Sequence, residues 1–295
     1  MLIDFKCVMM NIIFAINYSP NLMKLIPFKR LIYGFALLIA FLPMVSFAVS
    51  FSNNSTNPPY RIKTIVIDAG HGGKATGAVG KFSVEKKVTL EVALKLGKEI
   101  KKTLPGGKVL YTRTTDEFVP NIDRPNLANR EKADLFISIH CNSMPHTTKN
   151  RLSVRGVETF VAGFGRLDEQ DVAIRENADI LLEKDYKEKY DGYDPNDPTS
   201  MIVFSLLKNA YRDQSIKLAS LMQNEYIATG RVDRGVKEQN ILILQRAGMP
   251  SVLTEIGFIS CPEEEEYINS EHGQSEIVTN ILKAIQAYKK TVEVS

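Results

Sequence analysis

Short apolar runs rich in β-branched residues alternate along this chain with segments of helical periodicity. Strands that alternate with helices indicate an α/β fold, in which helices cover both faces of one sheet. Neither a repeat nor the signature of a second domain appears, so we expect one domain at residues 61–292. The predicted strands are residues 63–68, 108–112, 134–140, 156–161, 240–244 and 251–256. The predicted helices are residues 85–104, 123–132, 214–228 and 274–290.

The N-terminal segment has the pattern of an export signal. Basic residues precede the apolar run at residues 31–42, and the small-x-small triplet SFA, which ends at Ala48, follows it. This order predicts a secretory signal peptide over residues 1–48. An uncleaved membrane anchor is the alternative, since residues 31–49 just reach the length that spans a bilayer. Pro43 and the cleavage triplet favour removal, so we expect an exported chain with no stable membrane span after cleavage.

Two short segments flank the predicted signal core. Met23 is followed by Lys24 and would begin a standard signal peptide, so residues 1–22 are interpreted as a mis-called start. Residues 49–60 are rich in Ser, Asn and Pro, which predicts a linker before the folded domain.

The charge of the chain is balanced overall but uneven locally. It has 37 basic and 34 acidic residues, a net charge of +3, which argues against nucleic acid as the main partner. Residues 166–198 differ, with 11 acidic and five basic residues. This acidic insertion is interpreted either as a solvated excursion or as a lid or regulatory element over a site.

Three cysteines are present, and Cys7 would leave with the signal peptide. Export would place Cys141 and Cys261 in an oxidising compartment, where a disulfide between them is possible. Two buried free thiols are the alternative. Sequence does not supply the Cα separation that a disulfide requires.

Residues able to bind a metal or move a proton lie at the ends of predicted strands. His71 follows the first strand, His140 ends the third and Glu255 lies at the end of the last, while Glu85 begins the first long helix. Sites in open α/β sheets gather at the carboxyl ends of strands. Two histidines and one carboxylate suit zinc, with a fourth position for water. A second carboxylate can take a proton from that water.

Each of these residues also has a simpler interpretation. His71 could be a capping or solvent-facing residue in a Gly-rich loop, and His140 a hydrogen-bonded core histidine. Glu85 could be an ordinary acid in the first turn of a helix. Glu255 is costly to bury without a partner. The metal-site hypothesis therefore depends on the convergence of the four residues.

Five segments carry a family resemblance: IVIDAGHGG, VEKKVTLEVALKLG, YTRTTDEFV, NLANREKADLFISIHCNS and SVLTEIGFIS. Together they resemble the zinc-dependent N-acetylmuramoyl-L-alanine amidases (amidase type 3) that cleave bacterial peptidoglycan. The resemblance implies a twisted, mostly parallel sheet of about six strands flanked by helices on both faces. It also implies that His71, Glu85 and His140 bind one catalytic zinc ion (Zn²⁺) and that Glu255 is the catalytic acid/base.

The implied reaction is hydrolysis of the amide bond between N-acetylmuramic acid and L-alanine of the stem peptide, for cell-wall remodelling or daughter-cell separation. Such an exported enzyme would be periplasmic or cell-wall associated. A zinc peptidase that cuts within the stem peptide is one alternative. A catalytically silent murein-binding or activator protein is another, although the presence of all four site residues argues against it.

The resemblance also gives the acidic insertion a possible role. Relatives from Gram-negative bacteria can carry an autoinhibitory helix inserted after the second histidine, and residues 166–198 lie in that region. Glu183 is a candidate for the open zinc position. An activator protein would then act on the insertion.

Other polar residues have weaker interpretations. Asn142, two residues after His140, is a candidate for orienting the substrate or a zinc ligand. Arg234 and Lys237 either contact substrate carboxylates or form a solvated surface pair. The acidic run at residues 263–266 is interpreted as a solvated helix start.

Overall fold

The computed structural model describes residues 61–104, 106–163, 165, 170–194, 197 and 210–293. The predicted signal peptide (residues 1–48) and linker (residues 49–60) lie outside the described residues. Within the described ranges, no helix combines the length and the apolar character needed to cross a membrane.

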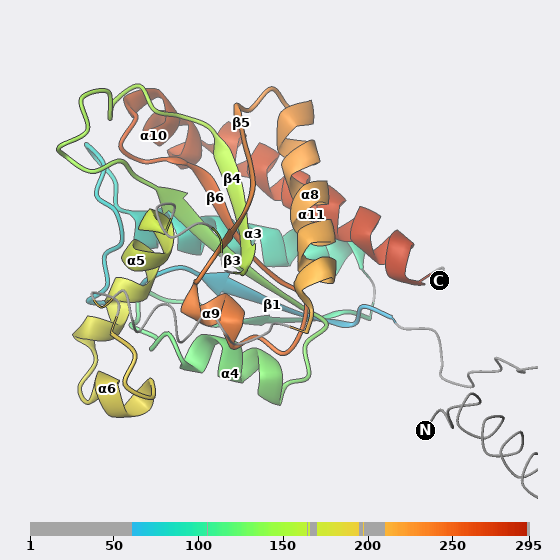
Figure 1. Ribbon diagram of the computed structural model, residues 1–295. Helices are drawn as coiled ribbons and strands as arrows, with labels where there is room; N and C mark the ends of the chain where they lie inside the picture. The colour runs from blue at the N-terminus through green and yellow to red at the C-terminus, as the bar shows by residue number, and fades with distance from the viewer. Residues whose placement is uncertain are drawn as a thin grey trace, which may run out of the picture. The chain divides into compact units, whose positions relative to one another are not determined.

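A six-stranded sheet forms the centre of the described domain (Figure 1). The strands are β1 (Thr64–Ala69), β2 (Lys108–Tyr111), β3 (Leu135–Asn142), β4 (Val157–Ala162), β5 (Asp233–Gln239) and β6 (Ser251–Phe258). They lie in the order β2-β1-β3-β6-β4-β5, and every neighbouring pair is parallel except β4 and β6. Parallel neighbours need long crossover connections, which the helices supply. The expected α/β fold with a mostly parallel sheet is confirmed.

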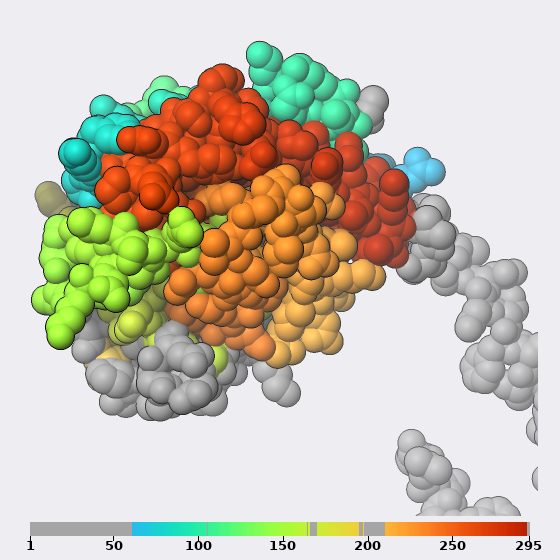
Figure 2. Space-filling model, turned by 90° about the horizontal axis from the view of Figure 1, so that it is seen from above, coloured from blue at the N-terminus to red at the C-terminus, as the bar shows by residue number. Residues whose placement is uncertain are grey.

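Helices cover both faces of this sheet. The helices are α3 (Glu85–Thr103), α4 (Asp123–Arg130), α5 (Asp171–Asn177), η3 (Ala178–Leu182), α6 (Tyr186–Lys189), α8 (Arg212–Ala228), α9 (Leu242–Gln245), α10 (Pro262–Asn269) and α11 (Glu271–Glu293). Buried residues of α3, α8 and α11 form one hydrophobic cluster with the sheet, and those of α4, α5 and α9 form another. Figure 2 shows α8 and α11 packed together at the surface in orange and red.

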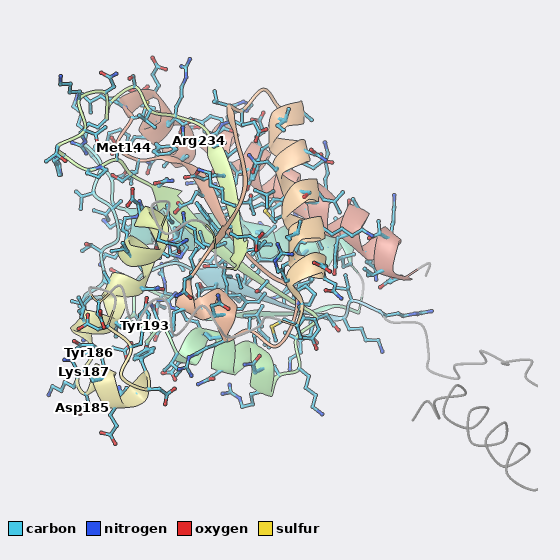
Figure 3. All side chains as sticks on the ribbon, in the orientation of Figure 1. Met144, Asp185, Tyr186, Lys187, Tyr193 and Arg234 are labelled. Carbon is cyan, nitrogen blue, oxygen red and sulfur yellow. The ribbon has the colours of Figure 1, made fainter. Side chains whose placement is uncertain are left out.

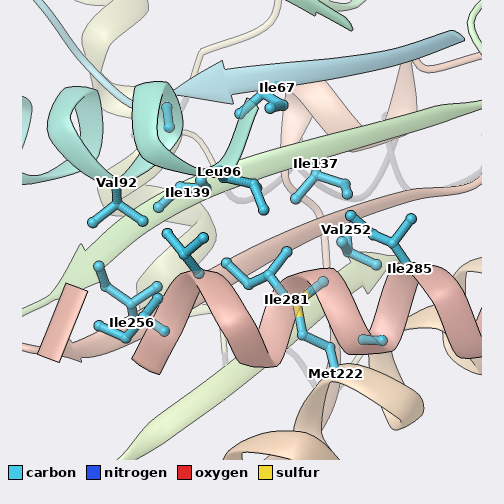
Figure 4. Close-up of a cluster of buried hydrophobic side chains, with 14 of the residues drawn as sticks. Ile67, Val92, Leu96, Ile137, Ile139, Met222, Val252, Ile256, Ile281 and Ile285 are labelled. Carbon is cyan, nitrogen blue, oxygen red and sulfur yellow. The ribbon is translucent and has the colours of Figure 1, made fainter. Parts of the chain in front are cut away.

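The larger cluster fixes the strands as a rigid platform (Figure 4). In β1, Ile65 and Ile67 pack into it, whereas Val66 between them packs into the cluster on the opposite face. This alternation follows from the two-residue period of a strand. Burial of each such side chain contributes about 1.5–3 kcal/mol. Because both faces are covered, the central strands read as continuous apolar runs, which made them recognisable in the sequence.

The prediction of a strand at residues 240–244 is wrong. The strand in this region is β5, at residues 233–239, and α9 occupies residues 242–245. The apolar run of α9 is buried as a helical turn, and a run this short does not distinguish a buried strand from a buried helix. Strand β5 lies at the edge of the sheet, is mostly half-buried and carries charged side chains, so it lacks the apolar pattern of the central strands.

The interpretation of residues 263–266 as a solvated helix start is also wrong for two of its residues. Glu264 and Glu265 of α10 are buried. The Glu265 carboxylate accepts hydrogen bonds of 2.8 Å from the three successive backbone N–H groups of residues 81–83. Helix α10 thereby fixes the loop that leads into α3.

The two cysteines in the described part of the chain are free and buried. Cys141 lies in β3 and packs into the larger hydrophobic cluster, and Cys261 precedes α10. The disulfide between them is not formed, and the alternative of two buried thiols describes them.

Replacing Glu265 with alanine should lower the free energy of unfolding by about 1–3 kcal/mol, because three part-buried backbone N–H groups lose their charged acceptor. Burial alone would raise the pKa of Glu265, but the hydrogen bonds from Phe82, Lys81 and Ser83 together outweigh it and hold the pKa below its ordinary value. The contribution is therefore present above the unfolded-state pKa of about 4.3 and is lost as pH falls through the folded-state pKa. Urea unfolding at pH 7 and pH 3 measures both effects.

The matched control is Glu266→Ala, an exposed glutamate on the same helix. It should change the unfolding free energy by less than about 0.5 kcal/mol. Equal losses in the two variants, or a Glu265→Ala loss that does not shrink at pH 3, would contradict the assignment.

Candidate metal centre

Three neighbouring parallel strands bring the predicted site residues to one edge of the sheet. The carboxyl ends of β1, β3 and β6 meet there. His71 follows β1, His140 lies in β3, and Glu255 lies in β6 directly opposite His140 in the register. Glu85 is the first residue of α3. All four side chains are buried, as expected for a site rather than for surface loops.

The turn after β1 is held in an unfavourable conformation. His71 has a φ of 58°, in the left-handed region, which costs on the order of 1 kcal/mol for a residue with a side chain. The buried Arg124 guanidinium donates to the backbone oxygens of His71 at 2.8 Å and Ala69 at 3.0 Å. It also donates to the Asp68 carboxylate at 2.7 Å. Burial alone would raise the pKa of Asp68, but Arg124 together with the Ser138 and Thr112 hydroxyls outweighs it and lowers the pKa, so Asp68 stays ionised.

The Glu85 carboxylate lies between the two histidines. Its Oε1 accepts the backbone N–H of Cys141 at 2.8 Å and lies 3.1 Å from His140 Nδ1. Its Oε2 accepts the backbone N–H of Ala78 at 2.7 Å and lies 3.2 Å from His71 Nε2. Two backbone donors therefore fix the carboxylate while each oxygen faces one imidazole.

Two glycines make room for this arrangement. A Cβ atom on Gly70 would lie 2.5 Å from the His140 ring, which real structures do not tolerate. A Cβ atom on Gly77 would lie 2.5 Å from the His71 ring and 2.6 Å from Glu85 Oε2, and Gly77 also has a φ of 66°. The glycines of the loop thus serve the close approach of backbone to side chains.

A fourth side chain completes the cluster from the acidic insertion. Glu176 Oε2, on α5, lies 2.7 Å from His140 Nδ1 and 3.3 Å from His71 Nε2. One ligand atom from each of His71, Glu85, His140 and Glu176 lies within 4.8 Å of the others. The insertion therefore contributes directly to the candidate metal centre.

The choice of Glu183 for this position is wrong. Glu183 follows η3, and its carboxylate accepts hydrogen bonds from Tyr190 Oη and the backbone N–H of Asn121. The signal for Glu176 is its spacing of four residues from Val172, which places both on one face of a helix. Both residues are buried in α5. The helical spacing in the first half of the insertion therefore indicated that Glu176 shares the buried face of the helix with Val172.

Two further residues of the insertion contact the site, and sequence analysis missed both. Asp179 Oδ2 lies 2.7 Å from His71 Nδ1, the nitrogen that faces away from the cluster. Arg175 Nη2 donates to Glu255 Oε1 at 2.9 Å, and its Nε donates to Glu176 Oε1 at 2.9 Å. The insertion thus contacts three parts of the site. Asp179 contacts His71, Glu176 lies between the two histidines, and Arg175 contacts Glu255.

Burial and mutual charge shift the pKa values of these groups. Burial alone would lower the pKa of His140, but the Glu176 and Glu85 carboxylates together outweigh it and raise the pKa to about 10. Burial alone would raise the pKa of Glu85, but His71 and His140 hold it at about 2. Burial raises the pKa of Glu255 well above its ordinary value, and the neighbouring carboxylates add to the effect. The carboxylates favour protonated, positively charged imidazoles. A divalent cation bound among these side chains would supply the positive charge in place of those protons.

The donor set fits a zinc ion. His71 Nε2 and Glu176 Oε2 are buried without a hydrogen-bond partner although they face each other across the cluster. Zinc is bound by histidine nitrogens and carboxylate oxygens, usually four in number. The Asp179 contact to His71 is the kind that orients a metal-binding imidazole. Glu255 Oε2 is likewise buried without a partner, beside the cluster rather than in it.

Helix α5 separates the cluster from a large pocket. The cavity that touches His71, His140 and Glu176 has a volume of about 10 Å³, which is room for one water at most. A pocket of about 900 Å³ opens beside it, and Asp171 and Arg175 of α5 line one wall. The cluster is therefore closed to a substrate while α5 stays in this place.

The weaker candidates lie along this larger pocket. Asn142 lines the pocket and donates to the buried carboxylate of Glu158, so it orients neither His140 nor Glu85 by a hydrogen bond. Arg234 and Lys237 line the pocket as well, and both are ion-paired with Glu158. Arg234 and Lys237 therefore lie in a concave pocket beside the cluster, whereas a solvated surface pair would lie on an open surface.

Comparisons of sequence and of structure with known proteins identify the same family. A sequence model of the family N-acetylmuramoyl-L-alanine amidase matches residues 65–287. The N-acetylmuramoyl-L-alanine amidase AmiC of Escherichia coli O6:H1 is 31% identical over 226 residues, which cover 76% of this chain and 52% of that relative. This chain thus spans about half the length of that amidase.

Solved structures agree with the sequence comparison. The crystal structure of an N-acetylmuramoyl-L-alanine amidase from Clostridium difficile 630 matches with a TM-score of 0.58 and 27% identity, covering 79% of this chain and 99% of that one. The CwlD amidase from Clostridioides difficile, solved in complex with the GerS lipoprotein, matches with a TM-score of 0.55 and 25% identity over 78% of this chain and 99% of that one. The chain therefore belongs to the N-acetylmuramoyl-L-alanine amidase family, amidase type 3.

Proposed function

We propose that this chain hydrolyses its peptidoglycan amide with one zinc ion, held by His71, Glu85 and His140, and with Glu255 as the acid/base. Family membership gives the reaction, which is cleavage between N-acetylmuramic acid and L-alanine. The observation that carries the proposal is the buried cluster of two histidines and two glutamates at the carboxyl ends of the central strands. The same set of ligands would serve a peptidase, so the bond that is cut must be identified on products.

The residues of the cluster divide the chemistry between them. Zinc in this position would supply Lewis acidity, which makes water nucleophilic at neutral pH and stabilises charge on the amide oxygen. Glu85 stays ionised, since its pKa is about 2, and holds both imidazoles in place. His71 keeps its orientation through Asp179 in the closed state.

Glu255 is suited to carry the proton. Its carboxylate is fully buried next to the cluster, one oxygen has no partner, and its pKa is raised. In hydrolysis it accepts a proton from the attacking water and returns it to the leaving amine of alanine. A raised pKa brings both transfers nearer to neutral pH.

The insertion holds the enzyme in an inactive state in this proposal. Glu176 takes the position that water and substrate require, and Arg175 takes one oxygen of Glu255. Activity then needs α5 to move away, and an activator protein that binds the insertion would supply the energy. CwlD has been solved in complex with the GerS lipoprotein, which supports a role for protein partners in this family.

The place of action follows from the substrate. Peptidoglycan lies outside the cytoplasmic membrane, so the enzyme would act in the periplasm or cell wall, in remodelling or daughter-cell separation. The predicted signal peptide at residues 1–48 supports export.

Replacing Glu176 with alanine should raise basal activity about tenfold or more. Glu176 Oε2 faces the two imidazoles at 2.7 and 3.3 Å. A charged contact of this kind contributes about 1.5–3 kcal/mol to the closed state, and each 1.4 kcal/mol is a factor of ten. The measurement is the initial rate of release from dye-labelled peptidoglycan, with zinc content determined on the same samples. The control is Glu188→Gln, an exposed glutamate of α6, which should leave the rate unchanged. An unchanged rate in a zinc-loaded Glu176→Ala variant would contradict the blocking role.

Adding Glu255→Gln to the Glu176→Ala chain should reduce turnover by about 10²–10⁴-fold while zinc content is retained, because only the proton transfer is lost. Mass spectrometry of products from purified peptidoglycan gives the measurement and the reaction together. The parent should release intact stem peptides that begin at L-alanine, and a chelator should abolish the release. Cuts inside the stem would identify a peptidase, and full turnover by the Glu255→Gln chain would overturn the acid/base assignment.

A further inference from the structure

The large pocket beside the metal centre is lined by cations that the hydrolysis itself does not use. Its volume is about 900 Å³, and Arg234, Lys237 and Phe258 are among its lining residues, together with residues of α5. Met144 lines it too, and Figure 3 shows Met144 and Arg234 on the same side of the molecule, away from Tyr186 of α6. The pocket is large enough for several residues of a peptide.

The charges on Arg234, Lys237 and Glu158 do not cancel. Lys237 Nζ and Arg234 Nε both approach Glu158 Oε2, and Asn142 donates to its other oxygen. Glu158 is 2% exposed, whereas the Arg234 and Lys237 side chains are 34% and 39% exposed. Two cations thus share one buried carboxylate, which leaves this group of three residues with one positive charge in excess, and Asp171 is the other carboxylate among the lining residues.

Arg234 is held ready for a further partner. Its guanidinium lies over the Phe258 ring, 4.9 Å from the centroid, which restricts its orientation. Its Nε is buried and faces Glu158 Oε2 at 3.6 Å, so the ion pair fixes the inner edge of the guanidinium. An arginine ordered in this way can offer its two terminal nitrogens to a carboxylate through two parallel hydrogen bonds.

The strand register places Arg234 and Lys237 next to the reacting bond. Glu158 of β4 is directly opposite Glu255 of β6. Neighbouring strands lie about 4.8 Å apart, and an extended peptide advances about 3.3 Å per residue. A peptide whose first amide nitrogen is at Glu255 therefore reaches Arg234 and Lys237 within one or two residues.

We propose that Arg234 and Lys237 form a subsite for a free carboxylate on the stem-peptide residue that follows alanine. Arg234 makes the paired hydrogen bonds, Lys237 adds charge, and Glu158 is the positioning residue for both. This inference rests on the proposed function and adds the substrate feature that the enzyme selects.

Binding of short peptides tests the subsite without turnover. The probes are an L-alanyl peptide with one free carboxylate on its second residue and the matched peptide with a carboxamide there. The full chain should bind the carboxylate peptide about tenfold or more tightly by calorimetry. Arg234→Gln should weaken that binding by about 10–100-fold, the range expected for a charge-assisted contact, without affecting the carboxamide peptide. Arg234→Lys should fall between, since it keeps the charge but loses the paired geometry.

The control variant is Arg155→Gln, which removes an exposed arginine paired with Glu263. It should bind both peptides as the unchanged chain does. Equal affinity of the unchanged chain for the two peptides, or binding of neither, would overturn the subsite. An equal loss for both peptides in Arg234→Gln would also overturn it, because that result reports a structural role. Product release from peptidoglycan is measured separately, so failure of the subsite leaves the hydrolase assignment intact.

Discussion

The buried ion pair between Asp68 and Arg124 is the constraint on which the site depends. His71 sits in a left-handed conformation that the chain would not adopt unaided, and Arg124 donates hydrogen bonds to the backbone oxygens of Ala69 and of His71 itself. A buried pair of this kind contributes little net stability, but removal of one partner leaves an uncompensated charge and costs about 3–5 kcal/mol. Its role is therefore to fix one geometry, in which the His71 imidazole faces Glu85.

In the proposed mechanism, the acidic insertion gives this rigid site two states, closed and open. In the closed state Glu176 faces both imidazoles and Arg175 holds Glu255. These three contacts all come from α5, so α5 would move away from the site as one unit. A partner that shifts such an equilibrium must bind the open state more tightly than the closed one. With a cation in the centre, Glu176 of the insertion would close it by competing with water for that cation.

Sequence predicted the central strands, the long helices and the four residues His71, Glu85, His140 and Glu255 at one edge. Those features follow from local patterns, namely apolar runs and residues at the ends of strands. The errors fall where tertiary contacts decide the outcome. Strand β5 is polar because it is an edge strand, and Glu265 is buried because a distant loop supplies three N–H donors. Glu176 was missed because its partners are more than thirty residues away in the chain.

The central claim is that His71, Glu85, His140 and Glu176 surround a single zinc ion in the closed chain. X-ray absorption at the zinc edge of the purified full chain tests it most directly. The account predicts one zinc per chain with only nitrogen and oxygen neighbours, two of them imidazole nitrogens, at about 2.0–2.2 Å. It also predicts that Glu176→Ala replaces one oxygen ligand by water without loss of the imidazole signal. A sulfur neighbour at about 2.3 Å, which would implicate Cys141, or a chain that binds no zinc would contradict the account.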